Sequence, residues 1–319
     1  RSFTSMDARN RALLLRVIER PGADPGHQKA SDFFASCMDV AAIEASGLHP
    51  LAPWEKEIAA ADTLEAAFAV GARLRRMPGA SPFVGLGIER DAEDPGRYVL
   101  VLVPGGFRLP AAALYVDEAQ RGLIDAYRSH VARMLELAGA RRVRARAQAR
   151  AIVDLERALA RAALGVDATG RPLPARAPAR GRAALRALDL ALLDASNRAL
   201  GGASPVFVVE AGTALRSAPP ETLRLYLRWQ LLDANAERLG RAFDEERFAF
   251  EAKLTGAVAM PPRPQRCAAA TLAALPDLVS RAWVEAAFGG GSRAPAAPWP
   301  ARSGPDAAPA PARPRARRR

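Results

Sequence analysis

The sequence has few of the residues that build metal sites in enzymes. It holds three histidines, His27, His49 and His130, and two cysteines in 319 residues. A zinc protease motif of the H-E-x-x-H type needs two histidines one helical turn apart and a glutamate beside the first. The three histidines are too far apart for that motif or for a compact His/Cys cluster. We therefore interpret each as a surface or packed histidine and assign neither catalytic nor metal-binding residues.

The sequence also lacks the usual motifs for phosphate binding, nucleophilic catalysis, membrane spanning and secretion. There is no G-x-x-x-x-G-K-[ST] phosphate loop and no nucleophile elbow. No apolar run reaches the roughly 18 residues that a membrane-spanning helix needs. The chain starts at Arg1 without a signal peptide, so we expect that a leader has been removed or that the N-terminus is missing. The lack of a signal therefore does not assign the protein to the cytoplasm.

What is present favours helices. Hydrophobic residues make up 50% of the chain, enough for a sizeable core, whereas aromatic residues make up only 6%, too few for a typical all-β sandwich. Apolar residues recur with helical spacing in most of the chain. We expect helices over residues 6–19, 31–41, 39–47, 63–77, 120–138, 141–164, 183–200, 222–239, 242–254 and 267–288.

The exception is the stretch from Pro82 to Gly106. Val84, Leu86 and Ile88 alternate with other residues, turn-forming residues follow, and the next segment is continuously apolar. This pattern predicts one β-hairpin over about residues 82–104. A short strand is also expected over Val206–Val209. The predicted fold class is mainly α, a multi-helical domain with one small hairpin.

The formal charge of +12 is concentrated in two segments. Residues 141–182 carry +8 and residues 289–319 carry +6, which leaves −2 for the rest. The second segment contains seven of the chain's prolines and is expected to be a disordered Pro/Ala/Arg-rich tail. In the first, a helical stripe could grip phosphate, although no aromatic residue lies between its arginines for base stacking. The alternative is a solvated helix face. The stripe consists of Arg142, Arg146, Arg150, Arg157 and Arg161.

Several phrases, in order, carry a family resemblance. They are "KASDFFASCMDVAAIEASGLHPL", "RYVLVLVPGGFRLP", "AYRSHVARMLELAG", "ETLRLYLRWQLLDANAERLGRAFDEERFAFEAKLTG" and "RCAAAT…RAWVEAAF". Together they resemble the N-terminal domain of the neprilysin/endothelin-converting-enzyme family of zinc metalloendopeptidases, over about Ser2 to Phe288. The resemblance implies a helical cap domain over residues 1–288, incomplete at its start, followed by the tail at 289–319. An arginine that grips the substrate in neprilysin aligns with Asp7, so that role is not carried over.

The resemblance also implies a disulfide. In the family, the cysteine of the Ser-Cys motif is bonded to that of the Arg-Cys motif, and these positions are Cys37 and Cys267 here. The alternative is two buried free thiols. A disulfide implies an oxidising compartment, so we expect a periplasmic, secreted or membrane-anchored extracytoplasmic protein.

The function implied is that of a cap on a peptidase whose catalytic part is missing. The family's H-E-x-x-H motif and downstream glutamate ligand lie beyond the Arg-Cys helix, and nothing similar follows Phe288, as if the reading frame had shifted. We expect no cofactor in this chain, zinc in the complete enzyme, small peptides as its substrates and the missing catalytic domain as partner. No specific nucleic-acid partner is expected. The alternatives are a non-catalytic peptide- or partner-binding module and a weak polyanion binder.

Overall fold

The computed structural model describes residues 3–20, 25–91, 94–174, 200–201 and 205–288. The chain divides into two compact units. The first combines residues 1–36 with residues 263–319, and the second runs from Cys37 to Pro262. The predicted tail at 289–319 and most of the predicted helix at 183–200 lie outside the described residues.

The first unit brings the two ends of the chain together in a set of helices. Here α1 contacts both α12 and α13. His27 Nε2 lies 2.7 Å from the carbonyl oxygen of Val17, and Ser31 Oγ donates to the carbonyl of Arg20 at 2.8 Å, which fixes α2 against the end of α1. The helices are α1 (Phe3–Glu19), α2 (Pro25–Met38), α12 (Arg263–Ala274) and α13 (Pro276–Phe288).

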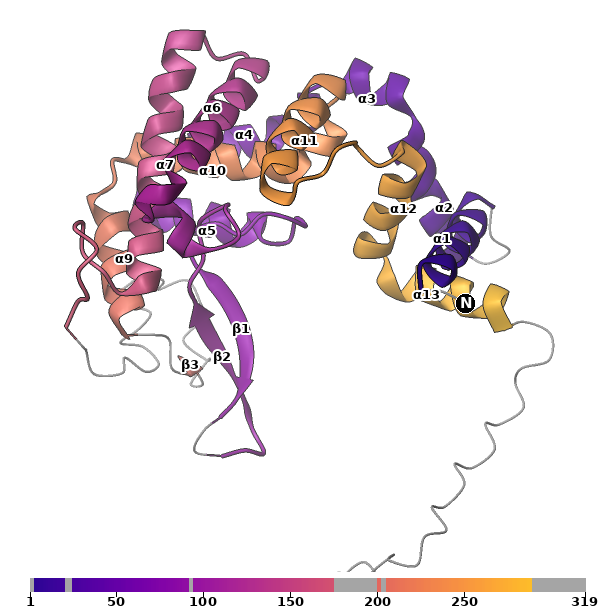
Figure 1. Ribbon diagram of the computed structural model, residues 1–319, viewed down its shortest axis with the longest axis horizontal. Helices are drawn as coiled ribbons and strands as arrows, with labels where there is room; N and C mark the ends of the chain where they lie inside the picture. Colours follow the sequence, from indigo (N-terminus) through magenta and orange to yellow (C-terminus); the bar gives the residue numbers. More distant parts are fainter. Residues whose placement is uncertain (1–2, 21–24, 92–93, 175–199, 202–204, 289–319) are drawn as a thin grey trace, which may run out of the picture. The chain divides into compact units, whose positions relative to one another are not determined.

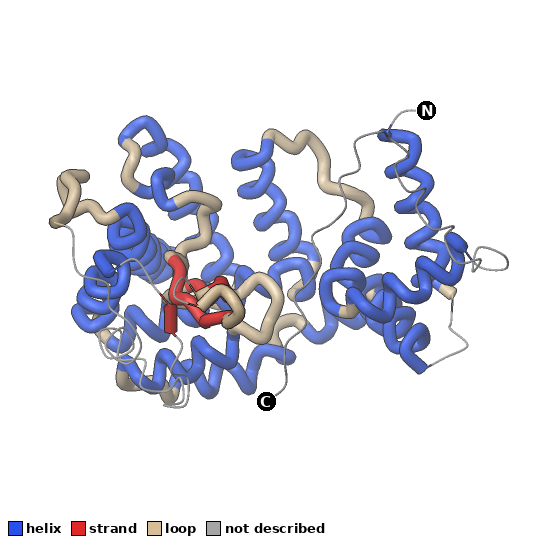
Figure 2. The backbone as a smooth tube through the Cα atoms, turned by 90° about the horizontal axis from the view of Figure 1, so that it is seen from below, coloured by secondary structure: helices blue, strands red, loops and turns tan. Residues whose placement is uncertain are grey.

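The second unit is a helical body with a small sheet, shown in Figures 1 and 2 as mainly helix with few strand residues. Helices α6 and α7 pack side by side, α9 packs against α7, and α10 contacts α4, α5, α6 and α7. Leu231 and Leu232 of α10 are fully buried, as its two-sided apolar pattern predicts. The helices are α3 (Val40–Ser46), α4 (Ala52–Ala59), α5 (Leu64–Leu74), α6 (Arg121–Leu137), α7 (Arg142–Leu164), α9 (Pro205–Ser217), α10 (Pro220–Asn235) and α11 (Arg241–Thr255), with 3-10 turns at η1 (His49–Leu51), η2 (Ala112–Tyr115), η3 (Glu118–Gln120) and η4 (Ala236–Arg238).

The predicted mainly helical fold and its hairpin are confirmed. Strands β1 (Gly85–Arg90) and β2 (Tyr98–Val103) pair antiparallel, from Gly85 opposite Val103 to Arg90 opposite Tyr98. Two further residues, β3 (Leu200–Gly201), pair in parallel with β2. Asp39 caps the start of α3, since its carboxylate accepts from Ala42 N at 2.9 Å, and α3 ends at Gly47, at the end of the predicted range.

Close packing and hydrogen bonds around Phe83 fix the base of the hairpin. Phe83 is 1% exposed and has a positive φ of 66°. Its ring packs at a tilt against Phe68 and Tyr226, with centroid distances of 4.6 and 5.3 Å. The Phe83 amide donates to the Tyr226 hydroxyl at 2.9 Å, and that hydroxyl donates to the carbonyl of Gly106 at 2.8 Å. Gly106 has a φ of 83°, and a Cβ there would lie 2.2 Å from the carbonyl oxygen of Phe83.

Three sequence predictions are wrong in detail. Val206–Val209 is not a strand but part of α9, where the buried Phe207, Val208, Ala211 and Leu215 follow helical spacing. Leu200, predicted to end a helix, belongs to β3. The helix predicted over 267–288 is two helices, because Pro276 has no amide hydrogen for a continuous helix and starts a new one as its first residue.

Candidate functional site

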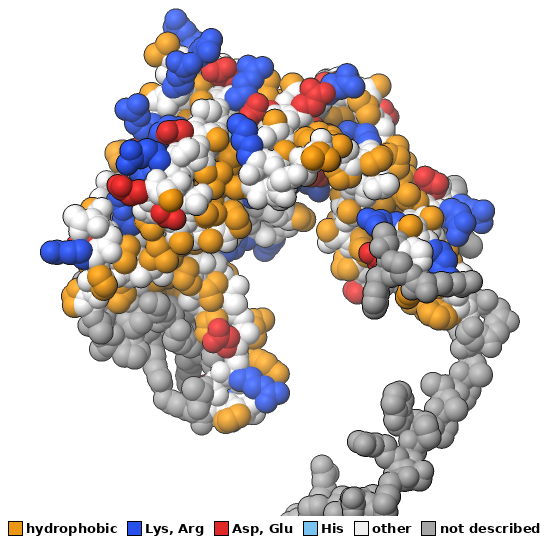
Figure 3. Space-filling view, viewed as in Figure 1, with side chains coloured by type: hydrophobic (Ala, Val, Ile, Leu, Met, Phe, Trp, Pro, Cys, Tyr) orange, Lys and Arg blue, Asp and Glu red, His pale blue; other side chains and the backbone are white. Residues whose placement is uncertain are grey.

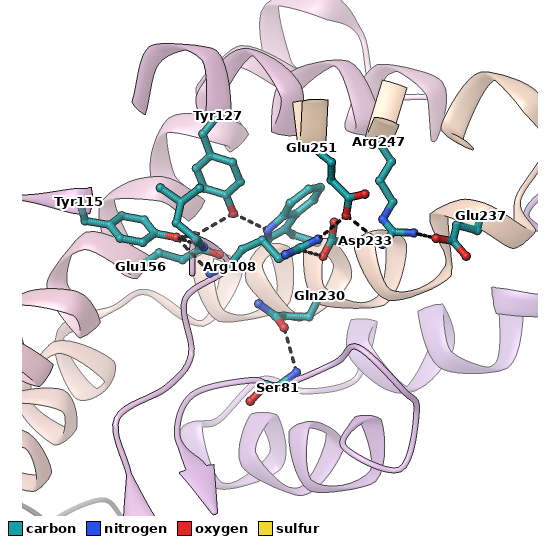
Figure 4. Close-up of polar contacts among 12 residues, drawn as sticks. Ser81, Arg108, Tyr115, Tyr127, Glu156, Gln230, Asp233, Glu237, Arg247 and Glu251 are labelled. Atoms are coloured by element: carbon teal, nitrogen blue, oxygen red, sulfur yellow. Dashed lines mark hydrogen bonds and ion pairs between the residues drawn. The ribbon is translucent and has the colours of Figure 1, made fainter. Parts of the chain in front are cut away.

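The most concentrated polar chemistry in the second unit is a buried network where α6, α7 and α10 meet (Figure 4). Glu156 of α7 is 0% exposed, and its Oε2 accepts hydrogen bonds from the hydroxyls of Tyr115 at 2.7 Å and Tyr127 at 2.8 Å. The indole Nε1 of Trp229 donates to Tyr127 Oη at 3.0 Å. The backbone amides of residues 108 and 109 both donate to Tyr115 Oη at 3.0 Å. The network therefore ties the loop after β2 to three helices.

Burial dominates the electrostatics of this cluster. It raises the pKa of Glu156 to about 7, although the hydrogen bonds from Tyr115 and Tyr127 act in the opposite direction. Burial, followed by the charge of Glu156, raises the pKa of both tyrosines well above their ordinary value. Both hydroxyls thus remain protonated donors at neutral pH, and Glu156 takes up or releases a proton in the neutral range.

A chain of charges continues from this cluster toward the surface. The guanidinium of Arg108 pairs with the buried Asp233 and lies 3.3 Å from a carboxylate oxygen of Glu251. Arg247 pairs with Glu237 and, at 2.9 Å, with the same Glu251. Burial alone would lower the pKa of Arg108, but the charge of Asp233, its hydrogen bond and the charges of Tyr127 and Glu251 together raise that pKa. The alternating charges join the loop after β2 to α10, η4 and α11 (Figure 4).

The hydrogen bonds and ion pairs of this network hold one loop and several helices in place, and beside it the Ser81 amide donates to Gln230 Oε1 at 3.2 Å. Glu156 Oε1 and Asp233 Oδ1 are buried without a hydrogen-bond partner among the described residues. Sequence reasoning missed all of these residues as a site. Arg108 and Asp233 lie in two of the family-like phrases, but neither phrase shows that the two side chains meet, and Glu156 lies in neither. The only available signal was the acidic Glu156 within the apolar face of its helix.

The described residues do not fit a catalytic zinc ion. No group of three or more His, Cys, Asp or Glu side chains within the described ranges could hold a metal. His130 is 4% exposed, lies with Nδ1 2.9 Å from Glu246 Oε1 and stacks on Phe250 at 4.7 Å. His130 therefore packs within the core, whereas His27 bonds to α1 and His49 begins η1. His27 lies in the first unit, and His49 and His130 lie in the second.

Both cysteines are engaged. Cys37 and Cys267 are each disulfide-bonded, and the described chain has no free cysteine. Cys267 is 1% exposed. The alternative of two buried free thiols is therefore wrong, and the pairing that the resemblance implies stays our proposal.

The arginine stripe is divided by the structure. Arg142, Arg146 and Arg150 line a cavity between α6 and α7. Arg157 and Arg161 line a second cavity, of about 420 Å³. Its lining also includes three acidic side chains, those of Asp117, Glu118 and Asp167. The Nε of Arg157 donates to the carbonyl of Tyr115 at 3.1 Å, which gives it a structural role. The five arginines therefore lie on two separate surfaces of α7 and do not form one phosphate-binding stripe.

Comparison with known families gives one extended match. The sequence pattern described as "Peptidase family M13", for the N-terminal part of that family, matches residues 1–297. Endothelin-converting enzyme-like 1 of Mus musculus is 29% identical over 174 residues, and the Homo sapiens protein is 30% identical over 175. Each alignment covers 50% of this chain and 22% of the relative.

Solved structures agree over a larger part of the chain. The zinc metalloprotease Zmp1 of Mycobacterium tuberculosis, in its open state, superposes with a TM-score of 0.76 and 26% identity. That similarity covers 89% of this chain and 46% of the Zmp1 chain. PepO from Lactobacillus rhamnosis HN001 shares the fold, with a TM-score of 0.68 at 18% identity, over 47% of its chain. The chain thus spans about half the length of the solved structures that it matches.

Proposed function

Since the chain belongs to peptidase family M13, we propose that it forms the helical cap of a neprilysin-type zinc metalloendopeptidase. In this proposal the cap covers a catalytic domain of the same enzyme and limits its substrates to small peptides. The catalytic domain supplies the zinc ligands and the glutamate that activates water for peptide-bond hydrolysis. This chain supplies the shape of the cap and no catalytic group.

One observation carries the proposal. The family match spans residues 1–297, and 89% of the chain superposes on 46% of the chain of a solved zinc metalloprotease. The buried network of Glu156, Arg108 and Asp233 supports the role of a rigid cap, since it fixes one loop and several helices in place.

The disulfide-bonded state of Cys37 and Cys267 supports an extracytoplasmic location. Disulfides persist in secreted and periplasmic proteins and are rare in the reducing cytosol. Among the helices that the structure describes, none has the length and apolar character to cross a membrane. We propose that the enzyme acts in the periplasm, outside the cell or as an ectodomain.

Sequencing of the source DNA tests this function. We would read the coding strand from the codon of residue 260 onward and translate all three frames. The proposal expects H-E-x-x-H and a downstream glutamate ligand in one of them. If no frame contains these ligands, no catalytic domain is encoded with the cap, and the chain is then a non-catalytic binding module.

A further inference from the structure

A cavity of about 620 Å³ lies in the second unit between α6 and α7. Five of the eight residues that line it are arginines, and one is acidic, Glu136. Figure 3 shows basic side chains gathered over α6 and α7 on the face in view. The lining arginines are Arg128, Arg133, Arg142, Arg146 and Arg150. With five positive charges against one negative charge, the lining is strongly cationic.

Three of these arginines form a regular row. Arg142, Arg146 and Arg150 are spaced four residues apart on α7 and are exposed. At a rise of about 1.5 Å per residue, they follow one another at about 6 Å and span about 12 Å. Within the described part of the chain, no acidic side chain pairs with any of them. Like charges at this spacing repel one another, so an anion across the row would stabilise it.

The facing helix α6 contributes a partly buried arginine with unused donor capacity. Arg128 binds Asp125 through NH1 at 2.8 Å, but its Nε is buried and has no hydrogen-bond partner. Arg133 lies beside it and contacts Glu136 at 3.3 Å. This Nε has almost no accessible surface and so does not open into the cavity, and Arg128 and Arg133 contribute two further positive charges to its lining.

We propose that this cavity binds a short linear anion that carries several phosphate groups. Planar guanidinium groups match phosphate oxygens with paired donors, and a row of about 12 Å fits several charges rather than one. No aromatic side chain lines the cavity, which disfavours stacked bases. Its concave form favours a compact chain over a flat lipid surface. The site is independent of the peptidase function, so either proposal can fail alone.

The test is titration calorimetry on the full 319-residue chain with sodium tripolyphosphate. The test variant is Arg142→Gln/Arg146→Gln/Arg150→Gln. The matched control is Arg9→Gln/Arg16→Gln/Arg76→Gln, which removes three exposed arginines and the same net charge elsewhere. We expect affinity to fall at least about tenfold in the test variant and to change less than about twofold in the control. Wild-type affinity should weaken steeply between about 50 and 200 mM salt.

Three outcomes would overturn the site. An equal loss of affinity in the two variants would make binding an effect of total charge. Wild-type binding to orthophosphate as tight as to tripolyphosphate, or no wild-type binding at all, would also contradict the proposal. Circular dichroism checks that the variants fold. If the triple variant does not fold, Arg146→Gln alone should still weaken binding, with Arg76→Gln as its control.

Discussion

Tyr127 and Glu156 are both fully buried and are joined by a hydrogen bond of 2.8 Å from the tyrosine hydroxyl to Oε2 of the carboxylate. Tyr115 donates to the same oxygen. A carboxyl group in this position is stabilised by its donors but penalised by burial, and burial has the larger effect on its pKa. The stability of the second unit should therefore depend on the protonation of Glu156.

The sign of that dependence follows from the pKa. The pKa of Glu156 is about 7 in the folded chain against an ordinary value of 4.5, so the folded state binds the proton more tightly. The stabilising contribution is fully present below about pH 4.5 and is lost as the pH rises through 7. Glu156→Gln keeps an acceptor for both tyrosines and cannot ionise. As the pH rises from about 4.5 to above 7, the free energy of unfolding of this variant should therefore increase by roughly 3 kcal/mol relative to that of wild type.

Urea denaturation of wild type and Glu156→Gln across this pH range measures the difference. Glu65→Gln is the control, because Glu65 is an exposed carboxylate on α5. This control removes one carboxylate outside the buried network. A difference between Glu156→Gln and wild type that stays constant with pH would contradict the raised pKa of Glu156.

Arg108 and Asp233 form an ion pair, so the losses in the free energy of unfolding caused by replacing each residue should not be additive. Asp233→Asn leaves the guanidinium of Arg108, which is 29% exposed, without its nearest counter-charge. We expect a loss of about 2 kcal/mol in the free energy of unfolding. The double variant Arg108→Met/Asp233→Asn should lose less than the sum of the two single variants. A double-mutant cycle by urea denaturation measures this, and strict additivity would contradict the coupling.

Alanine substitutions at Gly106 and Gly139 distinguish the cost of a steric clash from the cost of backbone strain, because the two glycines have similar φ values. Gly106 and Gly139 have φ values of 83° and 90°, but a Cβ on Gly106 meets the carbonyl oxygen of Phe83 at 2.2 Å, whereas a Cβ on Gly139 meets nothing within 4 Å. Gly139→Ala should cost about 1 kcal/mol from backbone strain alone. Gly106→Ala should cost several times more and loosen the base of the hairpin. Thermal unfolding of the two variants compares them directly, and equal costs would contradict the close packing.

The disulfide should hold its partners across a long loop. Peptide mapping without reductant should find Cys37 and Cys267 linked to each other, and thiol titration of the unfolded chain should find two thiols only after reduction. A bridge over this separation stabilises by about 5 kcal/mol in the chain-entropy model, so Cys37→Ser/Cys267→Ser should unfold at lower urea than wild type. Linkage between two molecules instead would contradict the pairing.

The sequence could predict the fold where local signals agree. Asp39, Gly47 and the alternation through Val84 and Ile88 mark element ends and type with short-range chemistry. The prediction failed at Val206–Val209, because a run of four β-branched or aromatic residues suits a buried strand as well as a buried helix. It also failed at Pro276, where one continuous helix was predicted although a proline interrupts the apolar helical pattern.

The buried network could not be predicted in the same way. Arg108 and Asp233 are 125 positions apart, and Tyr115 and Glu156 are 41 apart. Pairing at such distances is decided by the packing of whole helices, which no local spacing reports. The division of the arginine stripe has the same origin, since the surroundings of each arginine depend on which helix lies opposite. The family resemblance came from ordered phrases and is shown by the match over residues 1–297.

The central claim is that this chain caps an active site without providing one. The most direct measurement is zinc content by atomic emission, together with hydrolysis of small peptides, on the purified 319-residue chain after equilibration with zinc. We expect substoichiometric zinc and no chelator-sensitive cleavage. Stoichiometric zinc with peptide hydrolysis that stops on chelation and returns with zinc would contradict it.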